Sequence, residues 1–465
     1  MKGLRTRAAE RYVWIGVSAF LLTAVVLVAL APGVLAQNRE ADRRALLSAF
    51  QQILDFVQQN YVDEEKVNTR DLVQGALKGM FEALGDPYSA YLTDEDLRNL
   101  EDTTTGEFSG VGIVISKREG ARGAEVVSPI EGTPGYRAGL RAGDLIVEVD
   151  GEETRELTLN EIVNRIRGPR GTEVRFKVQR GASLLLDITV LRDIVEVPTV
   201  KHATMADGVG YLRITTFTPF TAGNIEQALA DLDRGGYRAL VVDVRDNGGG
   251  RLDSVIDIAD FFLSSGVIVS TRGRSRAENY SWYASADGTI VPQDLPIVVL
   301  INKGSASASE ILAGALKDTA RATVVGTPSW GKGTVQQVRR IGEFDFKLTM
   351  SKYFTPSGVS IDGTGITPDV EVVEEELTEA EAADYGRLVE QNRIGRFVEG
   401  NGPPSDGQVQ TFVEGLRREG FDIRERILRR LIRDEVNRTN NNPPVYDLEY
   451  DLALQKAVEI LGQSR

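Results

Sequence analysis

The sequence predicts a multidomain α/β protein, and three observations lead to this prediction. At 465 residues the chain is too long for one core of ordinary size, and its hydrophobic content of 42% is typical of a folded protein. Between about residues 197 and 373, short apolar runs typical of buried strands alternate with helical patterns. The segments before and after this region have different patterns, so several domains are expected.

The chain begins with a long apolar stretch, Val13 to Ala36, which contains no charged residue. It follows four basic residues: Lys2, Arg5, Arg7 and Arg11. The stretch is long enough to cross a membrane as a helix, and the basic flank predicts a cytoplasmic N-terminus. The sequence Val34-Leu35-Ala36 also fits a signal-peptidase site, although the apolar run exceeds the usual length of about 7 to 15 residues. We expect residues 1–36 to be a retained single-pass anchor with the rest of the chain outside the cytoplasm, at the periplasmic or extracellular face; a cleaved signal peptide is the alternative.

Residues 37–100 are predicted to form a helical region. Apolar residues recur with a helical period from Leu46 to Tyr61, and Thr69 is the predicted cap of a second helix that ends near Leu84. This pattern predicts an amphipathic helical hairpin. Such a hairpin either packs on the main body or mediates self-association.

Composition excludes several kinds of chemistry. The formal net charge of −14 argues against a nucleic-acid partner, because an acidic surface repels phosphates. The chain has no cysteine and one histidine, His202, so disulfides, thiolate zinc sites, cysteine nucleophiles and multi-histidine metal sites are impossible. We expect no metal and no cofactor. A hydrolase built from this chain would take its general base from Lys, Asp or Glu.

Residues 101–190 are predicted to form a small β domain with one helix, Leu159 to Arg167. Its predicted strands are separated by glycine turns and are Val111–Ile115, Ala124–Val127, Leu145–Val149 and Val174–Val178. Two of its segments, Phe108 to Ile113 and Arg137 to Ile146 with Val149-Asp150-Gly151 after it, resemble the characteristic motifs of PDZ domains. Taken alone, the glycines could simply make turns.

The PDZ resemblance implies a β-barrel-like domain that receives the C-terminal carboxylate of a peptide on backbone N–H groups. Glycines allow a backbone to approach an anion closely, and an exposed strand edge can pair with an extended peptide. The resemblance implies that an apolar last side chain enters a groove beside the loop. The candidate peptide-binding residues are Gly110, Val111, Gly112, Ile113, Ile162 and Ile166.

Residues 191–375 are predicted to form the α/β core. Its predicted strands are Ala239–Val244, Ile297–Ile301 and Ala322–Val325, and its predicted helices are Thr221–Asp233, Leu252–Leu263 and Ser307–Asp318. A serine-rich turn, Asn302 to Glu310, connects one of these strands to a helix. A serine at a tight strand-to-helix turn can present its hydroxyl to a substrate with helix N-terminal amides close by.

Lys332 follows Ser307 by twenty-five positions, in a glycine-flanked loop between two strand-like segments. A lysine can act as a base only when its neutral amine is populated, which requires burial to lower its pKa from about 10.4. The glycines on both sides would let this loop sink inward.

From Phe50 to Val373 the chain closely resembles the C-terminal processing peptidases, also called carboxy-terminal or tail-specific proteases. These are PDZ-containing serine endopeptidases that use a Ser/Lys pair. The segments that carry the resemblance, besides the PDZ motifs, are Gly85–Tyr91, Asp243–Gly250, Gly304–Ala315, Gly331–Gly333 and Gly363–Asp369. The resemblance implies an α/β serine protease core with ββα-type units.

The resemblance also implies roles for individual residues. Ser307 would be the nucleophile, Lys332 the general base and Gln336 the residue that orients the lysine, whereas Ser305 and Ser309 would be structural. The amide of Ala308 and one amide of Gly248 to Gly250, for which we choose Gly249, would donate to the oxyanion. Arg167, at the end of the PDZ helix, would couple peptide binding to catalysis; the alternative is an ordinary solvated cation at a helix end.

The expected function is that of an extracytoplasmic serine endopeptidase that recognises C-terminal segments of protein substrates. The first alternative is a catalytically inactive, membrane-tethered PDZ scaffold. The second alternative is nucleotide binding by a P-loop, because Gly326 to Lys332 fits most of that motif and follows a predicted strand. However, Gly333 occupies the position where a P-loop needs Ser or Thr. The residues after it resemble a strand and not the helix of a P-loop.

Residues 376–465 are predicted to form a charged helical region, with breaks at Asn401–Gly407 and Asn440–Pro444. One predicted helix has an arginine-rich polar face opposite Ile423, Ile427, Leu428 and Leu431. The family resemblance implies that terminal helical regions mediate dimerisation, so a homodimer is expected.

Overall fold

The computed structural model describes residues 41–463 except 95, 99, 101–106, 118–120, 131–132, 142, 181–183, 197, 374, 376 and 440–443. The described part of the chain divides into two compact units, one ending at Tyr91 and the other beginning at Leu92. The predicted membrane helix, Val13 to Ala36, lies outside the described residues. In the described part of the chain, no helix is long and apolar enough to span a membrane.

The first unit contains a pair of helices. Residues 41–60 are helical, and α2 (Thr69–Glu82) follows the short 3₁₀ turn η1 (Glu64–Lys66). Asn68, not Thr69, caps α2, because its side chain accepts a hydrogen bond of 2.8 Å from the Arg70 amide. The prediction of Thr69 as the cap was wrong by one position, since both residue types can fill that role. The strand β1 (Ala90–Leu92) ends this part of the chain.

The β domain is a sheet in the order β3-β4-β5-β7-β8, with β6 paired to β5. These strands are β3 (Ile113–Ser116), β4 (Ala124–Pro129), β5 (Leu145–Val149), β6 (Glu152–Glu153), β7 (Glu173–Arg180) and β8 (Leu184–Leu191), and the helices are α4 (Pro134–Arg137) and α5 (Leu159–Ile166). A separate ribbon joins β2 (Glu107–Gly110) to β9 (Asp193–Glu196). The predicted strand Val111–Ile115 therefore starts two residues too early: β2 ends at Gly110 and β3 begins at Ile113. The Val111 carbonyl between them accepts the Gly135 amide instead of a ladder partner.

The α/β core contains a six-stranded sheet in the order β10-β11-β12-β15-β16-β19, parallel except for the antiparallel pair β10–β11. The strands are β10 (Val200–Thr204), β11 (Val209–Ile214), β12 (Ala239–Asp243), β15 (Ile297–Ile301), β16 (Thr323–Gly326) and β19 (Val370–Glu371), and η2 (Ala206–Gly208) joins the first two. Every residue of β12 and β15 is buried. Their sequences are apolar except for Asp243 at the end of β12, which reflects cover on both faces of the sheet.

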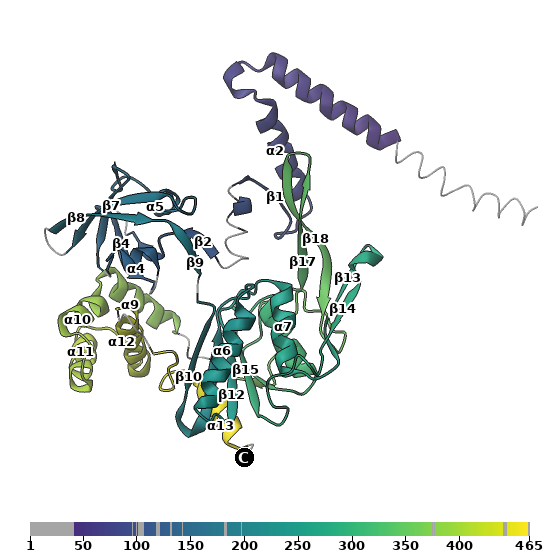
Figure 1. Cartoon of the computed structure of the whole chain (residues 1–465). Coiled ribbons are helices and arrows are strands. Elements are labelled where there is room, and N and C mark those ends of the chain that lie inside the picture. Colours follow the sequence, from purple (N-terminus) through teal and green to yellow (C-terminus); the bar gives the residue numbers. More distant parts are fainter. Residues whose placement is uncertain are drawn as a thin grey trace, which may run out of the picture. The chain divides into compact units, whose positions relative to one another are not determined.

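Helices distant in sequence cover the two faces of this sheet. On one face α6 (Thr221–Arg234), α7 (Leu252–Phe262) and α8 (Ala308–Asp318) contribute to the largest apolar cluster. On the other face lies α13 (Leu452–Gln463), whose buried Leu454 and Leu461 pack with Tyr211, Val241 and Val298 of the strands. The last helix of the chain, yellow in Figure 1, is thus a layer of the α/β core.

A second sheet has the order β18-β13-β14, and β17 pairs with β18. Its strands are β13 (Val267–Gly273), β14 (Tyr280–Tyr283), β17 (Thr334–Ile341) and β18 (Phe344–Phe354), with η3 (Arg276–Glu278) between β13 and β14. The β17–β18 hairpin leads out of the Lys332 loop. It therefore positions the residues that follow the candidate base.

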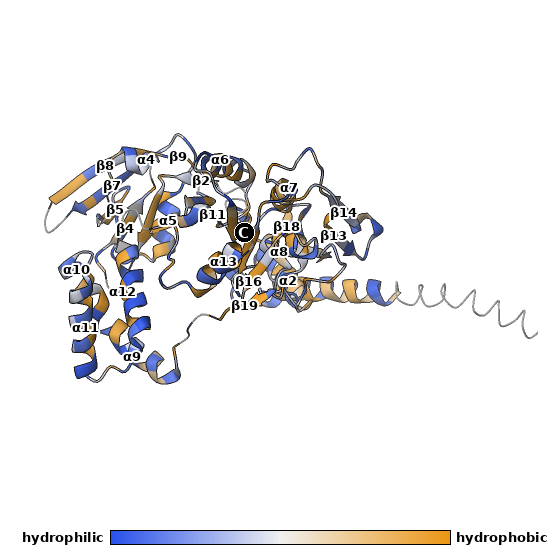
Figure 2. Cartoon of the chain, turned by 90° about the horizontal axis from the view of Figure 1, so that it is seen from below, coloured by the Kyte–Doolittle hydropathy of each residue, from blue (hydrophilic) through white to orange (hydrophobic). Residues whose placement is uncertain are grey.

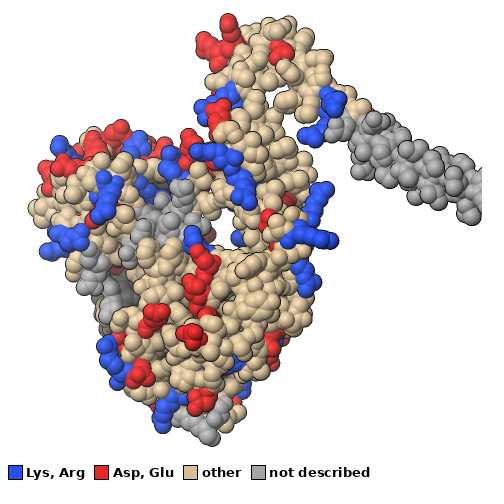
Figure 3. All heavy atoms as spheres, turned by 45° about the vertical axis from the view of Figure 1, so that its right-hand side comes forward, with Lys and Arg blue, Asp and Glu red and all other residues tan. Residues whose placement is uncertain are grey.

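Four helices form a bundle with its own core: α9 (Glu379–Glu390), α10 (Arg393–Asn401), α11 (Asp406–Arg418) and α12 (Glu425–Thr439). Each carries both polar and apolar residues, as Figure 2 shows. The predicted break at Asn401–Gly407 separates α10 from α11, while most of the second predicted break lies outside the described residues. On the face seen in Figure 3, acidic and basic side chains are interspersed, which does not favour a nucleic-acid partner.

Candidate active site

The serine-rich turn brings Ser307 to the start of α8 in an unusual backbone conformation. Ser307 is the N-cap of α8, with φ 55° and ψ −113°. A positive φ at a residue other than glycine costs about 1–3 kcal/mol and persists only where the surroundings enforce it. Here the Ser307 amide donates to Glu310 Oε2 at 2.8 Å, and its carbonyl accepts the Glu310 and Ile311 amides at 2.9 Å. The turn therefore holds a strained serine in one geometry.

The three serines of the turn differ in exposure. Ser305 and Ser309 are fully buried, and their hydroxyls donate to the carbonyls of Val244 and Asn247 at 2.8 Å. Ser307 is partly exposed. Its two neighbours therefore tie the turn to the chain after β12, and only the Ser307 hydroxyl combines access with the strained position.

Glu310 is a residue of this candidate site that the sequence analysis did not single out. Its side chain is fully buried, and its carboxylate accepts four hydrogen bonds. The Ser307 and Lys332 amides donate to Oε2 at 2.8 and 2.9 Å, and the Ser329 hydroxyl and Gly331 amide donate to Oε1 at 2.6 Å. Since the bonds from the Ser307 and Lys332 amides end on the same oxygen, the backbone nitrogens of these two residues lie less than about 6 Å apart.

A signal for this contact exists in the sequence. Ser307 and Glu310 have the spacing of a capping box, in which the acidic side chain accepts the amide of the residue that precedes the helix. The pattern could predict the bond to the Ser307 amide. It could not predict the bonds to Ser329, Gly331 and Lys332, which are about twenty positions further along the chain.

The Lys332 loop is fixed on two sides. The Trp330 amide donates to the Ser305 carbonyl at 3.0 Å, and the Gly331 carbonyl accepts the Gly363 amide at 2.9 Å. Gly333 has no room for a side chain, because a Cβ placed there would lie 2.1 Å from the Asp362 nitrogen. The glycines beside Lys332 therefore allow close backbone packing.

The surroundings of Lys332 favour its neutral form. Burial is the largest influence that lowers the pKa of Lys332, and the positive charge of Lys347 on β18 lowers it further. The Glu310 carboxylate acts in the opposite direction, and the net pKa lies below the ordinary value for lysine. A lysine with a lowered pKa can accept a proton under milder conditions than a solvated one.

Gln336 lies on β17 and is held by two threonines. Its amide nitrogen donates to the Thr334 and Thr349 hydroxyls at 2.8 and 3.1 Å. The β17–β18 register shifts between Val335 and Gln336. Such bulges change the direction of a side chain. The carbonyl oxygen of Gln336 is then the atom that this side chain can offer as an acceptor to an amine.

The glycine turn after β12 lies against Ser307. A Cβ placed on Gly249, which has φ 103°, would lie 2.8 Å from Ser307 Cβ and 3.0 Å from the Ala308 nitrogen. The Gly249 amide donates to Asn247 Oδ1 at 2.9 Å. To donate to an oxyanion this bond has to open, or another of the three glycines has to supply the amide. Ala308 is the first residue of α8 and is buried.

The candidate peptide-binding residues gather around α5. Val111, Ile162 and Ile166 are buried in the core of the β domain, and Ile113 packs against them from β3, at the edge of the described sheet. Gly110 ends β2, and Gly112 has φ 74° with Thr133 where a Cβ would lie. Arg167 follows α5, and its amide donates to the Val163 carbonyl at 2.9 Å.

Two further sequence features, the single histidine and the P-loop-like segment, can now be placed in the structure. His202 lies on β10, with Nε2 3.3 Å from Asp231 Oδ2. The strand β17 follows Gly333, so the segment after Lys332 lacks the helix of a P-loop. Within the described ranges, no group of His, Cys, Asp and Glu side chains could hold a metal ion.

Comparison with known proteins identifies the family. Peptidase family S41 matches residues 208–372, the PDZ domain matches residues 125–180, and the N-terminal domain of the activating protease CtpB matches residues 30–96. The carboxy-terminal-processing protease of Bartonella bacilliformis is 42% identical over 351 residues, which are 74% of this chain and 78% of that protein. The chain belongs to the carboxy-terminal processing protease family.

The family includes further proteins that are similar to this chain. The carboxyl-terminal-processing protease of Synechocystis is 34% identical and covers 81% of this chain and 90% of its own length. The solved photosystem II D1 C-terminal processing protease is 29% identical, covers 70% of this chain and 92% of its own, and has a TM-score of 0.42. The match to peptidase family S41, the PDZ match and the curated relatives together make the protein a mixed α/β, serine-type peptidase with a PDZ domain.

Proposed function

We propose that this protein is an extracytoplasmic endopeptidase that recognises C-terminal segments of protein substrates through its PDZ domain and cleaves them with a Ser307/Lys332 pair. The observation that carries the proposal is the buried Glu310 carboxylate. It holds the backbone of both candidate residues, through the Ser307 and Lys332 amides. A strained serine and a lysine of lowered pKa thus belong to one hydrogen-bonded unit.

The mechanism begins with the neutral amine of Lys332, which accepts the Ser307 hydroxyl proton as the oxygen attacks the substrate carbonyl. The protonated lysine then donates this proton to the leaving amine, so the peptide C–N bond breaks and an acyl-enzyme remains. Water attacks the ester by the same route, with Lys332 again as the base. Every step uses side chains of the chain itself.

The tetrahedral oxyanion would be stabilised by backbone amides. Ala308 supplies one, as the first residue of α8, and the Gly248–Gly250 turn supplies the other. Gly249 is the proposed donor because its backbone lies against Ser307 and Ala308. Its amide becomes available when the bond to Asn247 opens on substrate binding.

Gln336 would orient Lys332 through its carbonyl oxygen. This role is supported by the two threonine contacts that fix its amide nitrogen. A hydrogen bond from the lysine amine to this oxygen would direct the nitrogen lone pair toward Ser307.

The PDZ domain would bind the apolar C-terminus of a polypeptide beside β3 and α5. Gly110, Val111 and Gly112 would supply amides for the carboxylate, and the partly exposed Ile113 would contact the last side chain. Ile162 and Ile166 are buried here and would join this contact when α5 moves away from β3. Arg167 would couple this binding to catalysis. The membrane anchor at residues 1–36 and the homodimer also belong to the proposal.

The test is turnover of an extended peptide by the full chain and by Ser307→Ala and Lys332→Met. We expect each substitution to reduce kcat by at least about a thousandfold, because each removes a group that acts on the reacting atoms. The matched control is Lys303→Ala, which removes an exposed lysine of the same turn and should leave kcat unchanged. Equal turnover by the wild type and Ser307→Ala would support the inactive-scaffold alternative.

A further inference from the structure

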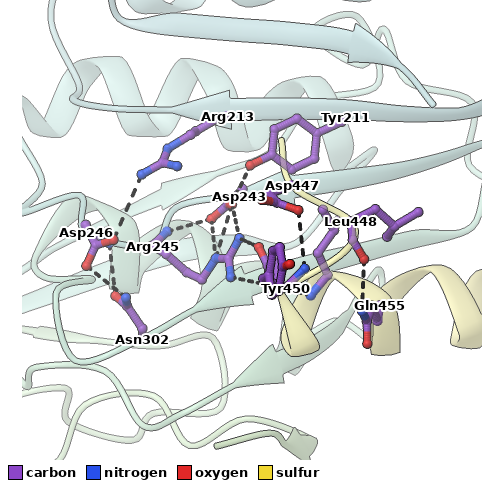
Figure 4. Close-up of polar contacts among 12 residues, drawn as sticks. Tyr211, Arg213, Asp243, Arg245, Asp246, Asn302, Asp447, Leu448, Tyr450 and Gln455 are labelled. Carbon is purple, nitrogen blue, oxygen red and sulfur yellow. Dashed lines mark hydrogen bonds and ion pairs between the residues drawn. The ribbon is translucent and has the colours of Figure 1, made fainter. Parts of the chain in front are cut away.

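A buried ionic cluster joins the end of the chain to the turn beside the nucleophile. Asp451 immediately precedes α13, and its two carboxylate oxygens accept hydrogen bonds from the Arg245 guanidinium at 2.8 and 2.6 Å. The two side chains are 206 positions apart in sequence and are only 17% and 14% exposed. Figure 4 shows Arg245, on the chain after β12, beside the yellow C-terminal segment.

Arg245 also binds the end of its own strand. Its Nε lies 3.0 and 3.1 Å from the two Asp243 oxygens, and its Nη2 lies 2.6 Å from Oδ2. Asp243 is fully buried and also accepts the Tyr211 hydroxyl at 2.6 Å. One arginine therefore lies between two carboxylates, one from the sheet and one from the C-terminal segment. Figure 4 shows the first of these contacts, between Asp243 and Arg245.

The contact between Asp243 and Arg245 favours the charged form of both side chains. Burial alone would raise the pKa of Asp243, but the charge and hydrogen bonds of Arg245 hold it below its ordinary value. Burial would lower the pKa of Arg245, but Asp243 and Asp451 raise it. Burial and the Asp243 charge raise the pKa of Tyr211, so its hydroxyl remains a donor. The proposed mechanism uses none of these groups.

The cluster lies two residues from the contacts that hold the nucleophile turn. Arg245 is followed by Asp246 and then by Asn247, which is fully buried. The Asn247 carbonyl accepts the Ala306 amide at 3.0 Å and the Ser309 hydroxyl at 2.8 Å, one residue before and two residues after Ser307. A shift of Arg245 would therefore be transmitted to both sides of Ser307.

Asp246 and Asn302 make a second connection. Asp246 has φ 57°, and its amide donates to Asn302 Oδ1 at 2.9 Å while its carboxylate accepts the Asn302 side-chain amide at 2.8 Å. Asn302 begins the turn that carries Ser307, and its own amide donates to the Ser305 hydroxyl at 3.0 Å. The segment from Arg245 to Asn247 is thus bound at one end to the C-terminal segment and at the other to the nucleophile turn.

We propose that Asp451 is a positioning residue for catalysis: by holding Arg245, the C-terminal segment fixes the turn that carries Gly249 and contacts the Ser307 loop. The inference rests on the proposed function of Ser307. It assigns to the last helix of the chain a role in the active site in addition to covering the sheet.

Asp451 also caps α13, because its Oδ1 accepts the Leu454 amide at 2.8 Å, a role that Asn can keep. Apolar packing gives α13 a second source of stability. Ala453, Leu454, Ala457 and Leu461 are buried against the sheet. Buried ion pairs often contribute little net stability relative to apolar residues, whereas removal of one partner disturbs the other. The two contributions can therefore be separated by substitutions within the same segment.

The experiment compares Asp451→Asn with Leu461→Ala in the full chain, using kcat and KM for a peptide substrate and the Tm of each variant. We expect Asp451→Asn to lower kcat by about tenfold to a hundredfold with KM changed less than about threefold, because misplacement of a catalytic group affects the chemical step. Leu461→Ala should lower Tm and leave kcat at 25 °C within about twofold, because it removes packing far from the ionic cluster. The rate at which a fluorophosphonate labels Ser307 should fall with kcat in Asp451→Asn only.

Asp451→Glu is a second variant, for the case that Asp451→Asn does not fold. It keeps the negative charge but displaces it by one methylene. We expect it to keep the wild-type Tm within a few degrees and still lower kcat. Arg245→Met combined with Asp451→Asn should lower kcat no more than Arg245→Met alone, since both act through one contact. A wild-type kcat in Asp451→Asn and Asp451→Glu, with Ser307→Ala inactive, would refute the inference and leave the proposed function intact. An active Ser307→Ala would instead refute the proposed function.

Discussion

The PDZ domain and the α/β core hold their candidate functional residues by different physical means. In the PDZ domain, Val111, Ile162 and Ile166 belong to a cluster of buried apolar side chains. In the α/β core, Ser307 and Lys332 are held through their backbone amides by one buried carboxylate. Apolar burial is nondirectional, whereas each hydrogen bond to Glu310 fixes a distance and an angle.

This difference suits the two tasks. A peptide groove has to accept many side chains of similar size, and an apolar surface tolerates that variation. A nucleophile and its base have to meet within a few tenths of an ångström, and a directional network supplies that precision. We therefore expect substitutions in the core to change rates steeply and substitutions in the groove to change affinity.

The largest effect should come from Glu310→Gln. The amide keeps one acceptor oxygen but turns an NH₂ group toward N–H donors, so at least two of the four bonds are lost. We expect kcat to fall by more than about a hundredfold and the free energy of unfolding by about 3 kcal/mol, the cost of breaking a buried polar network. Peptide turnover and denaturant unfolding would measure both. Glu459→Gln on α13 is the control, because its ion pair with Lys456 is exposed; wild-type kcat in Glu310→Gln would contradict the role assigned to Glu310.

A smaller effect, on affinity, should come from Ile113→Asp. Ile113 packs against the PDZ core from β3, where a charge would repel an apolar C-terminal side chain. We expect a peptide with an apolar C-terminus to bind at least about tenfold more weakly, as for loss of an important contact residue. Fluorescence anisotropy would measure the Kd. Val114→Asp should bind normally, because Val114 is 47% exposed and adjacent residues of a strand face opposite sides; equal weakening by both would show that the charge alone is responsible.

The smallest effect should be a shift in the pH dependence of kcat/KM, caused by Lys347→Gln. The positive charge of Lys347 lowers the pKa of Lys332, so its removal should raise that pKa. Because the neutral amine is the active form, the rising limb of kcat/KM should move to higher pH by a fraction of a pH unit, while the plateau should be unchanged. A pH–rate profile from pH 5 to 10 would measure the shift. Movement to lower pH would contradict the assignment of Lys332 as the base, and Lys303→Ala should not move it.

Local patterns predicted most elements of the fold. The strands Ile297–Ile301 and Leu145–Val149 have the predicted bounds, and α8 begins one residue later than predicted, because Ser307 is its cap. The predicted strand through Val111 is broken because its carbonyl is bound by Gly135, a contact that the local sequence does not contain. Propensity and periodicity act over a few residues and give elements their approximate limits.

By itself the sequence determined the kinds of chemistry open to this protein: without cysteine and with a single histidine, a serine nucleophile has to take its base from another residue type. The motifs around Ser307 and Lys332 also determined the family. Only the tertiary structure decided that Glu310 holds both segments, that Lys347 approaches Lys332, and that Asp451 reaches Arg245 across 206 positions. These contacts depend on how the strands and helices pack, because hydrogen bonds and charges act between atoms that are close in space, whatever their separation along the chain.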